Sequence, residues 1–461
     1  MTNIVLVGGG WSGISAIAFL LKELGFDNLV VIDAHQSQIT KSLSEQGIKT
    51  IIWHDNYQPH SKDFILYSDA AKNSPEVTQR FQLSRQNPKI KPPVSFFQFL
   101  GIISQFFKTI AISGTHGKST TTAMTIRGAH KLSDRFALGI LGAFTNFGKH
   151  QNYLLNPTLK KPLADLFKYI TTGKGRYLDP KIIKKYRFVV EADEFDKHFL
   201  WLHPYISWIT NIEIDHTDTY PTPNHYLQAF QDFIKRTEKL SYLLSPAPAQ
   251  FLENPKSKLI KKLHNFEFKS IFWKHNIKNA NLAAKLIKHT TSSSIQEIKR
   301  VLANFPGLRR RQEYIGSFEG KKIFSDYAHH PTEIYETIKA FKQNFPTQKI
   351  AAIFQPHQGR RIVEFWHDFK KPLSLADEVF IYPIYHARED FDALKKEFKL
   401  IRQLNIDSFD QLSQEFAKFI GGKYISPDAS PKEILKNIKS PIGLILSAGD
   451  IDWKFRQFLG S

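Results

Sequence analysis

The sequence predicts an α/β protein made of three consecutive α/β domains, and three observations support this fold class. The chain has 461 residues, whereas one domain usually has about 100 to 200. Short apolar segments alternate with segments of helical periodicity. Glycine-rich turns join a strand to a helix at 8–13 and at 114–117, as in parallel sheets that bind nucleotides. We expect a Rossmann-like domain at 1–107, a central P-loop ATPase-type domain with a parallel sheet at 108–304, and a Rossmann-like domain at 305–461.

The composition is that of a folded enzyme. Apolar residues make up 42% of the chain, which is enough to build buried cores. The N-terminal segment lacks the features of a signal peptide, and no apolar stretch reaches the roughly 18 residues of a membrane span. The chain contains no cysteine, which excludes disulfides and thiolate metal sites. We expect a cytoplasmic protein without a membrane span, either a monomer or a homodimer.

The formal net charge is +20. Clustered cations attract nucleic acid and anionic membranes, so a nucleic-acid-binding ATPase is one hypothesis. Lysine is abundant along the entire chain, however, and a compositional bias explains the charge without such a partner. We expect no nucleic-acid partner, and small substrates that carry phosphates and carboxylates.

The first domain opens with a β-α-β pattern. A strand is expected from Ile4 to Val7, a helix up to Gly25, and a second strand from Leu29 to Ile32. The connecting turn has the pattern GxGxxG, formed by Gly8, Gly10 and Gly13. Such a turn lets the backbone approach a pyrophosphate at the helix N-terminus, and Asp33, which ends the second strand, is placed to bind a ribose hydroxyl. A tight turn that packs the helix on the strand, or a nicotinamide site, would also explain the glycines.

The most specific motif is GTHGKST at 114–120, which follows an expected strand from Lys108 to Ser113 and precedes a helix from Thr120 to His130. Backbone amides of such a turn surround phosphates, the lysine neutralises their charge, and the following serine binds magnesium. The motif departs from the strict GxxxxGK[ST] spacing, because Ile112 stands where the first glycine belongs. The order of strand, loop and helix nevertheless predicts a phosphate-binding loop.

Two acidic clusters follow the next strands. EADEFD begins at Glu191 after a strand from Arg187 to Val190, and NIEIDHTDTY, with His216, follows a strand from Tyr205 to Thr210. Strand ends of a parallel sheet meet at one edge, and carboxylate oxygens suit magnesium. Helix caps are the alternative interpretation of each cluster alone. Two clusters beside a phosphate loop favour a magnesium site.

The third domain again alternates strands and helices. Strands are expected at Lys322 to Ser325, Ile350 to Phe354, Glu378 to Tyr382 and Gly443 to Ser447, and a helix at Pro331 to Phe345. Further motifs are KHNIKNA with Asn276, the run Arg309 to Arg311, SDYAHHPTE at 325–333 and FQPHQGRR at 354–361. The histidine pair is more typical of hydrogen-bonded structure than of a metal site, because adjacent side chains of an extended segment point apart. The segment 149–185 shows weak periodicity, and a loop insertion is one explanation.

Together and in this order, these motifs resemble those of the Mur ligase family over essentially the whole chain. YAHHPTEIY and IYHARE are most similar to the members that add L-alanine to UDP-N-acetylmuramate. The resemblance implies three domains that bind the UDP-sugar, ATP and the amino acid in turn. It also implies that an acyl phosphate forms on the lactyl carboxylate and that the amine of alanine then attacks it. The alternative within the family is a recycling ligase that adds a preformed tripeptide, to which EADEFD is slightly closer.

The resemblance also implies the cofactors ATP and Mg²⁺ and a set of site residues. The implied catalytic residues are Lys118, Glu191 and His216. The implied metal ligands are Ser119, Glu191 and His216. The residues implied for ATP are Gly114, Thr115, His116, Gly117, Lys118, Ser119, Thr120, Asn276, Arg310, Arg311 and Asp326. Those implied for the UDP-sugar are Gly8, Gly10, Gly13, Asp33 and Ser68. Those implied for the amino acid are His330, His357 and Arg361.

The sequence departs from the family pattern at four places. Trp11 replaces a small residue of the glycine turn, Ser325 replaces an Asp, and Gln358 with Gly359 replaces a step that usually contains an Arg or Thr and an aromatic residue. The segment 141–186, where sugar-nucleotide contacts are expected, matches poorly. These departures bear on the substrate more than on the chemistry.

Overall fold

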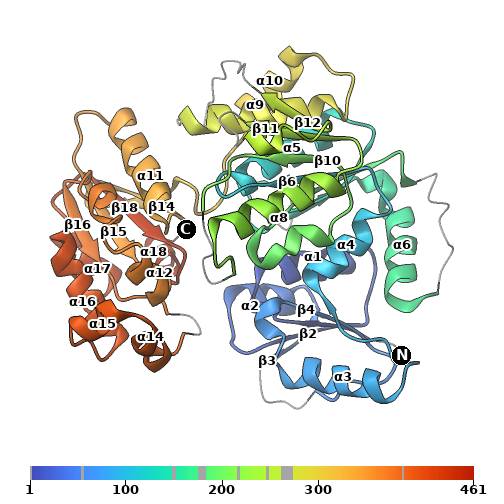
Figure 1. The fold of residues 1–461 in the computed structure, drawn as a ribbon, viewed down its shortest axis with the longest axis horizontal. Helices are drawn as coiled ribbons and strands as arrows, with labels where there is room; N and C mark the ends of the chain where they lie inside the picture. The colour runs from blue at the N-terminus through green and yellow to red at the C-terminus, as the bar shows by residue number, and fades with distance from the viewer. Residues whose placement is uncertain are drawn as a thin grey trace. The chain divides into compact units, whose positions relative to one another are not determined.

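The structure is a computed structural model that describes residues 3–52, 57–147, 152–174, 183–214, 219–244, 249–260, 274–386 and 389–460. In this part of the chain three β-sheets follow one another along the sequence, each flanked by helices (Figure 1). Most neighbouring strands are parallel, so the α/β fold class is confirmed. One compact unit ends at Pro306 and holds the first two sheets, and a second begins at Gly307 and holds the third. The boundary near 107 therefore stays a prediction.

The first sheet is parallel, with strand order β3-β2-β1-β4-β5. Its strands are β1 Ile4–Val7, β2 Leu29–Asp33, β3 Lys49–Ile52, β4 Phe64–Tyr67 and β5 Val94–Ser95. Its helices are α1 Ser12–Glu23, α2 Gln38–Glu45, α3 Pro75–Gln86 and α4 Phe96–Ser104, with the short helix η1 Asp69–Ala71. Because β1 lies between β2 and β4, the glycine turn after β1 emerges beside the ends of both neighbours.

The second sheet has the order β12-β11-β10-β6-β9-β7-β8, and β8 alone among the described strands of this sheet is antiparallel to its neighbour. Its strands are β6 Thr109–Ser113, β7 Phe136–Ile140, β8 Tyr153–Leu155, β9 Arg187–Glu191, β10 Pro204–Ile209, β11 Leu240–Leu244 and β12 Ser257–Ile260. Its helices are α5 Lys118–Leu132, α6 Lys160–Thr172, α8 Pro223–Arg236, α9 Lys274–Lys288 and α10 Ile295–Ala303, with η2 Pro157–Leu159, η3 Phe195–Trp201 and η4 Ala249–Phe251. The central strand β6 lies between β9 and β10, so the three predicted motifs emerge side by side.

Two expectations for this sheet need correction. The helix after the phosphate loop begins at Lys118 rather than Thr120, because Gly117 adopts φ +81° as its N-cap. The segment 149–185 is not simply a loop, because its described part contains β8, η2 and α6. Helix α6 buries Leu163, Leu166 and Phe167, whose spacing is that of one helix face. The surrounding lysines and threonines obscured this periodicity.

The third sheet has the order β13-β14-β18-β15-β16-β17, with β13 antiparallel to β14. Its strands are β13 Glu313–Phe318, β14 Lys321–Asp326, β15 Ile350–Gln355, β16 Glu378–Ile381, β17 Lys423–Tyr424 and β18 Ile442–Ser447. Its helices are α11 Pro331–Asn344, α12 Gly359–Glu364, α13 Lys370–Leu373, α14 Phe391–Glu397, α15 Lys399–Gln403, α16 Phe409–Ile420, α17 Pro431–Asn437 and α18 Ile451–Leu459. The expected strands and the expected helix at 331–345 agree with these bounds to within one or two residues.

Local sequence signals explain where several helices begin. Ser95, Ser294 and Ser430 each accept a hydrogen bond from the backbone N–H three residues later, and the side chain at that position returns a bond to the serine N–H. This capping box satisfies backbone donors that a helix start leaves unpaired. Pro75 and Pro331 occupy first-turn positions, where the missing N–H has no consequence.

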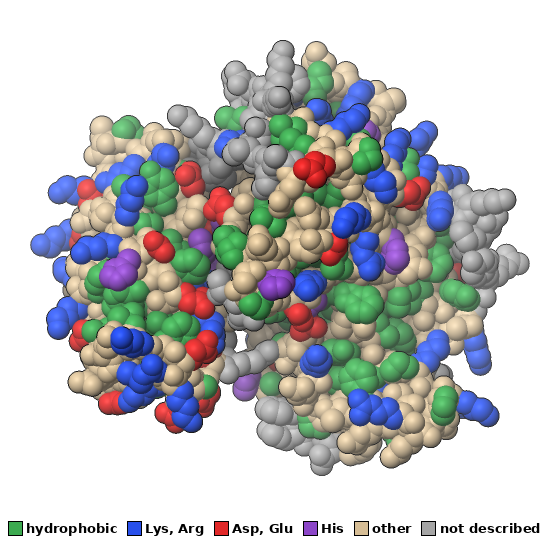
Figure 2. Space-filling model, viewed as in Figure 1, with side chains coloured by type: hydrophobic (Ala, Val, Ile, Leu, Met, Phe, Trp, Pro, Cys, Tyr) green, Lys and Arg blue, Asp and Glu red, His purple; other side chains and the backbone are tan. Residues whose placement is uncertain are grey.

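The face of the molecule that Figure 2 shows carries its cations in a dispersed pattern. On the visible face, Lys and Arg side chains are spread over many elements and are interspersed with Asp and Glu (Figure 2). This distribution is consistent with a compositional origin of the +20 charge, although the absence of a nucleic-acid partner stays a prediction. Within the described residues, no helix is long and apolar enough to cross a membrane.

Candidate functional site

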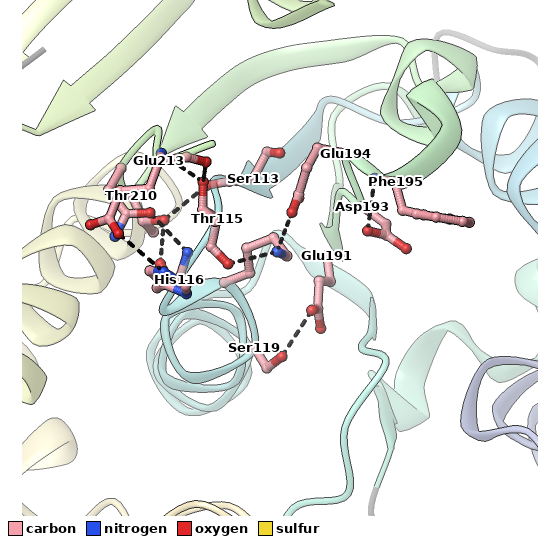
Figure 3. Close-up of polar contacts among 12 residues, drawn as sticks. Ser113, Thr115, His116, Ser119, Glu191, Asp193, Glu194, Phe195, Thr210 and Glu213 are labelled. Atoms are coloured by element: carbon pink, nitrogen blue, oxygen red, sulfur yellow. Dashed lines mark hydrogen bonds and ion pairs between the residues drawn. The ribbon is translucent and has the colours of Figure 1, made fainter. Parts of the chain in front are cut away.

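The phosphate loop connects β6 to α5 at the carboxyl edge of the second sheet (Figure 3). Gly114 and Gly117 have φ values of +123° and +81°, a region that L side chains rarely adopt. A Cβ atom at Gly114 would lie 2.2 Å from Thr210 Oγ1, and one at Gly117 would lie 2.7 Å from Asn279 Oδ1. Both glycines are therefore required by backbone conformation and by close neighbours.

Replacing Gly114 by alanine is expected to weaken ATP binding at least tenfold and to destabilise the fold by about 1–3 kcal/mol, because it adds both strain and a steric clash. Isothermal titration calorimetry and thermal unfolding would measure the two effects. Gly47→Ala is the matched control, since Gly47 has φ +73° but nothing within 4 Å of its would-be Cβ atom. Unchanged ATP affinity in Gly114→Ala would contradict the assignment of this loop.

The segment after β10 anchors the phosphate loop. The Thr115 hydroxyl donates to the carbonyl of Glu213 at 2.8 Å, and the N–H of Glu213 donates back to Thr115 Oγ1 at 2.9 Å. The N–H of His116 donates to Asn211 Oδ1 at 2.8 Å, and its Nε2 lies 3.3 Å from Glu213 Oε2. Thr210 Oγ1 donates to the carbonyl of His116 at 2.6 Å. The sequence motif TNIE thus holds the shape of the loop.

Lys118 is the cation of the loop. Its Nζ atom donates to the carbonyl of Thr115 at 3.1 Å and to Glu194 Oε1 at 2.9 Å. The side chains of Lys118 and Glu194 are 15% and 1% exposed. Burial lowers the pKa of Lys118, but the nearby carboxylates of Glu194, Asp193 and Glu191 outweigh burial and raise it. Lys118 is therefore positively charged at neutral pH.

Glu191 and Ser119 meet at the start of α5 (Figure 3). The Ser119 hydroxyl donates to Glu191 Oε1 at 2.8 Å, and the N–H of Gly142 donates to Glu191 Oε2 at 3.1 Å. Burial raises the pKa of Glu191, although the charge of Lys118 opposes this effect. A hydroxyl and a carboxylate in contact beside a phosphate loop are hard oxygen donors of the type that Mg²⁺ prefers, so these two residues fit the implied metal.

The third implied metal ligand, His216, lies outside the described residues. Within the described residues, no group of three or more His, Asp and Glu side chains forms a metal cluster. Thr120 is half-buried in the first turn of α5. Asn276, near the start of α9, is 5% exposed and accepts a hydrogen bond at 3.2 Å from Asn279, which contacts the phosphate loop at Gly117. Asn276 is therefore linked to the phosphate loop through Asn279.

The residues implied for the UDP-sugar surround the glycine turn of the first sheet. Gly8 has φ +87°, and a Cβ atom there would lie 2.1 Å from Ser68 Oγ, so Ser68 packs directly on the turn. The N–H of Gly10 donates to Asp33 Oδ2 at 2.7 Å. Asp33 thus orients the turn itself, and binding of a ribose by Asp33 stays a prediction. A Cβ atom at Gly13 would lie 2.4 Å from the ring of Trp11.

A backbone link joins α1 to the phosphate-binding edge of the second sheet. The Ser12 hydroxyl donates to the carbonyl of Gly142 at 2.6 Å. The N–H of Gly142 in turn donates to Glu191 Oε2. Asn152 Nδ2 donates to the carbonyl of Ser12 at 2.8 Å. The poorly matching segment after β7 is therefore what connects the glycine-turn helix to Glu191.

The remaining implied ATP residues lie in the second compact unit. Asp326 accepts from the N–H groups of Gln312 and Ala328 at 2.9 and 2.8 Å, and burial raises its pKa to about 6. The guanidinium of Arg310 donates to the carbonyl of Ser447 at 2.7 Å and to that of Gly449 at 2.9 Å. Arg310 thus fastens the start of this unit to the end of β18, and a nucleotide contact by its side chain stays a prediction.

Arg311 and Ser325 also lie in this unit. Arg311 lies 3.7 Å from Glu333 Oε1 and 5.2 Å from the centre of the Tyr327 ring. Ser325, which departs from the family pattern, donates its hydroxyl to Asp452. Asp452 also accepts from Arg456 Nε at 2.9 Å. The replacement of Asp by Ser at 325 therefore avoids placing a second carboxylate beside Asp452.

The residues implied for the amino acid lie at the carboxyl edge of the third sheet. His330 caps α11 by accepting from the N–H of Thr332 through Nδ1 at 3.3 Å. Burial, together with the nearby His329 and arginines, lowers the pKa of His357 to about 3, so its imidazole is neutral. It stacks on Tyr385 at 5.7 Å with an 18° interplanar angle. Arg361, in α12, is 9% exposed.

The departure from the family pattern at Gln358 and Gly359 has a steric explanation. A Cβ atom at Gly359 would lie 2.7 Å from the Phe409 ring and 2.8 Å from Leu394. The preceding residue, Gln358, has φ +69° and donates its N–H to the carbonyl of Tyr385 at 3.0 Å. Helices α14 and α16 therefore pack so closely on the start of α12 that only glycine fits.

Sequence reasoning did not assign roles to several residues of the site. Glu194, Gly142, Asn279 and Tyr385 contact predicted site residues through the bonds and rings described above. The motif EADE indicated that Glu194 lies near the site but did not predict its pairing with Lys118. Gly142 and Tyr385 act through a backbone amide and an aromatic face, and neither leaves a motif of its own.

Comparisons with known proteins agree with this geometry. Residues 112–308 match the model of the Mur ligase middle domain, and residues 310–421 match that of the Mur ligase, glutamate ligase domain. UDP-N-acetylmuramate–L-alanine ligase of Chlorobium chlorochromatii is 30% identical over 422 residues, which cover 84% of this chain and 83% of the relative. The enzyme of the same name from Alkaliphilus metalliredigens is 27% identical over 92% of this chain and 90% of its own length.

A solved structure has the same fold. The crystal structure of UDP-N-acetylmuramate-alanine ligase from Thermotoga maritima superposes with a TM-score of 0.71 at 22% identity and covers 100% of this chain and 99% of its own. The phosphate loop, the acidic motif that faces it and the matches over both regions lead to one conclusion. The chain belongs to the Mur ligase family.

Proposed function

We propose that the protein is an ATP-dependent ligase that forms an amide bond between the lactyl carboxylate of UDP-N-acetylmuramate and L-alanine in peptidoglycan precursor synthesis, in the cytoplasm. The observation that carries the ATP-dependent chemistry is the convergence of Lys118, Ser119 and Glu191 at one edge of a parallel sheet. The names of the curated relatives support the choice of substrates.

ATP fits the phosphate loop, whose backbone amides and Lys118 supply positive potential. Ser119 and Glu191, with His216, would hold Mg²⁺, and the ion would supply charge neutralisation at the transferring phosphoryl group. Glu194 holds Lys118 in place through their 2.9 Å ion pair. Such a preorganised cation stabilises charge that develops in the transition state without reorganisation at that moment.

The reaction proceeds in two steps. The lactyl carboxylate attacks the γ-phosphate of ATP, so that an acyl phosphate forms and ADP leaves. The amine of alanine then attacks the acyl carbon, an amide bond forms and inorganic phosphate leaves. Lys118 stabilises the charge of the first step, and positioning of both substrates supplies much of the acceleration.

The UDP-sugar is assigned to the residues around the first sheet, and the amino acid is assigned to the residues around the third sheet. Gly8, Gly10, Gly13, Asp33 and Ser68 line the UDP-sugar side. His330, His357 and Arg361 serve the amino acid, whose carboxylate suits the guanidinium of Arg361. The neutral imidazole of His357 can accept a hydrogen bond, which suits an incoming amine.

The test is phosphate release from ATP and magnesium in the presence of UDP-N-acetylmuramate, with L-alanine or the stem tripeptide added in parallel. We expect release that depends on L-alanine and a product heavier by one alanyl residue in mass spectrometry. Release that depends on the tripeptide would instead identify a recycling ligase. Absence of release with either acceptor would overturn the proposed substrates.

A further inference from the structure

His198 lies between the first and second sheets. It belongs to η3, which begins at Phe195 within the motif EADEFD, and it is 6% exposed. Its Nε2 atom lies 2.7 Å from Asp69 Oδ2, and its Nδ1 atom lies 3.9 Å from Asp193 Oδ2. One ring face stacks on Phe97 of α4, with centroids 3.8 Å apart and planes 8° apart. The imidazole therefore lies among two carboxylates and an aromatic ring.

The two carboxylates belong to the two halves of the site. Asp69 directly follows Ser68, which packs on the glycine turn of the UDP-sugar side. Asp193 lies in the segment that begins with Glu191 and continues with Glu194, the partner of Lys118. A single side chain thus connects the end of β4 to the segment that holds the phosphate-transfer residues.

The backbone before His198 is strained. Asp196 and Lys197 have φ values of 44° and 58°, both in the left-handed region. Consecutive non-glycine residues in this region cost free energy and persist only where surrounding contacts hold them. Phe199 donates its N–H to the carbonyl of Asp193 at 2.8 Å, which closes the turn. This conformation directs His198 inward, against Asp69 and Phe97.

The charge of His198 follows from its surroundings. Burial lowers its pKa, but the 2.7 Å contact with Asp69 and the negative charges of Asp69 and Asp193 outweigh burial and raise the pKa to about 9. The other groups packed against the ring, Phe97 and Phe195, are uncharged. The imidazolium is therefore populated at neutral pH, where it offsets the charge of two carboxylates.

We propose that His198 is a positioning residue that fixes Asp69 against the EADE segment and neutralises negative charge in the wall of the UDP-sugar site. The proposal rests on the proposed function for the identity of the substrate. The pyrophosphate and lactyl carboxylate of that substrate are anionic, so the negative charges of Asp69 and Asp193 would repel it if the imidazolium did not offset them. The pair of Asp69 and His198 therefore permits an anion to bind, whereas the charge of Asp69 alone would repel it.

The first experiment compares steady-state kinetics of His198→Gln, Asp69→Asn and the double variant. Glutamine keeps a donor but not the charge, so we expect KM for UDP-N-acetylmuramate to rise about tenfold, with a smaller change in kcat and in KM for ATP. Removal of the Asp69 charge in the double variant should restore KM to within about threefold of wild type. His225→Gln is the matched control, since His225 is exposed on α8 and bonds to Thr222.

The second experiment is independent of turnover. The imidazole of His198 in the full chain should titrate near pH 9 by NMR, and Asp69→Asn should move the midpoint toward 6.5. The free energy of unfolding should be higher in wild type than in His198→Gln. This difference should have its full size below pH 6.5, decrease between pH 6.5 and 9, and disappear above pH 9. An ordinary titration midpoint would overturn the charge argument even if the proposed substrates were wrong. A KM for His198→Gln within twofold of wild type, or a double variant no better than His198→Gln, would overturn the positioning role.

Discussion

Lys118→Ala is expected to lower turnover by about 10³-fold or more, because removal of a preorganised cation at a transferring phosphoryl group forfeits transition-state stabilisation. Lys118 is placed for this role by the carbonyl of Thr115 and by Glu194 Oε1, at 3.1 and 2.9 Å from its Nζ atom. Phosphate release with saturating substrates is the measurement. Turnover close to wild type would remove Lys118 from the mechanism.

The same substitution has a structural effect that must be separated from the chemical one. The side chain of Glu194 is 1% exposed, and removal of Lys118 would break the ion pair of a buried carboxylate, at a cost of about 3–5 kcal/mol. The double variant Lys118→Met with Glu194→Gln removes both charges and should regain most of that stability in thermal unfolding. If the double variant folds normally and is still inactive, the loss of activity belongs to the cation and not to unfolding.

Glu191→Gln is expected to lower turnover by about 10²–10³-fold and to weaken Mg²⁺ binding, because the substitution keeps the size of the side chain but removes the charge of a proposed metal ligand. Glutamine can still accept one of the two hydrogen bonds from Ser119 and Gly142, so the fold should change little. Titration with Mn²⁺ followed by electron paramagnetic resonance measures metal affinity without turnover. Glu45→Gln, on the surface of α2, is the control, and unchanged metal affinity in Glu191→Gln would exclude the ligand role.

The sequence predicted the centre of the site because parallel strands impose its geometry. The motifs after β6, β9 and β10 were expected at one sheet edge, and Ser119, Glu191 and Thr210 do lie around one loop. The β-α-β pattern of the first sheet and the strands of the third were also predicted closely. In the first two sheets, the spacing of apolar residues and a glycine turn determined the position of a functional group.

Contacts between different sheets were not predictable in this way. Asp69, beside the first sheet, meets His198, beside the second. Such contacts depend on how sheets pack, which periodicity within one element does not encode. Helix α6 was missed for another reason, because lysines and threonines surround its buried face.

The peptide group of Gly142 connects α1 to Glu191 with its carbonyl and its N–H, and no side chain at 142 takes part. Its backbone does not need glycine, since its φ is not in the left-handed region and an added Cβ atom would meet Glu191 Oε2 at an ordinary 3.6 Å. Any residue that keeps a backbone N–H could form this link, and only proline would abolish it. Amino-acid substitutions in this segment can therefore accumulate while the contact is kept. Two relatives can share the link and still show no sequence similarity there.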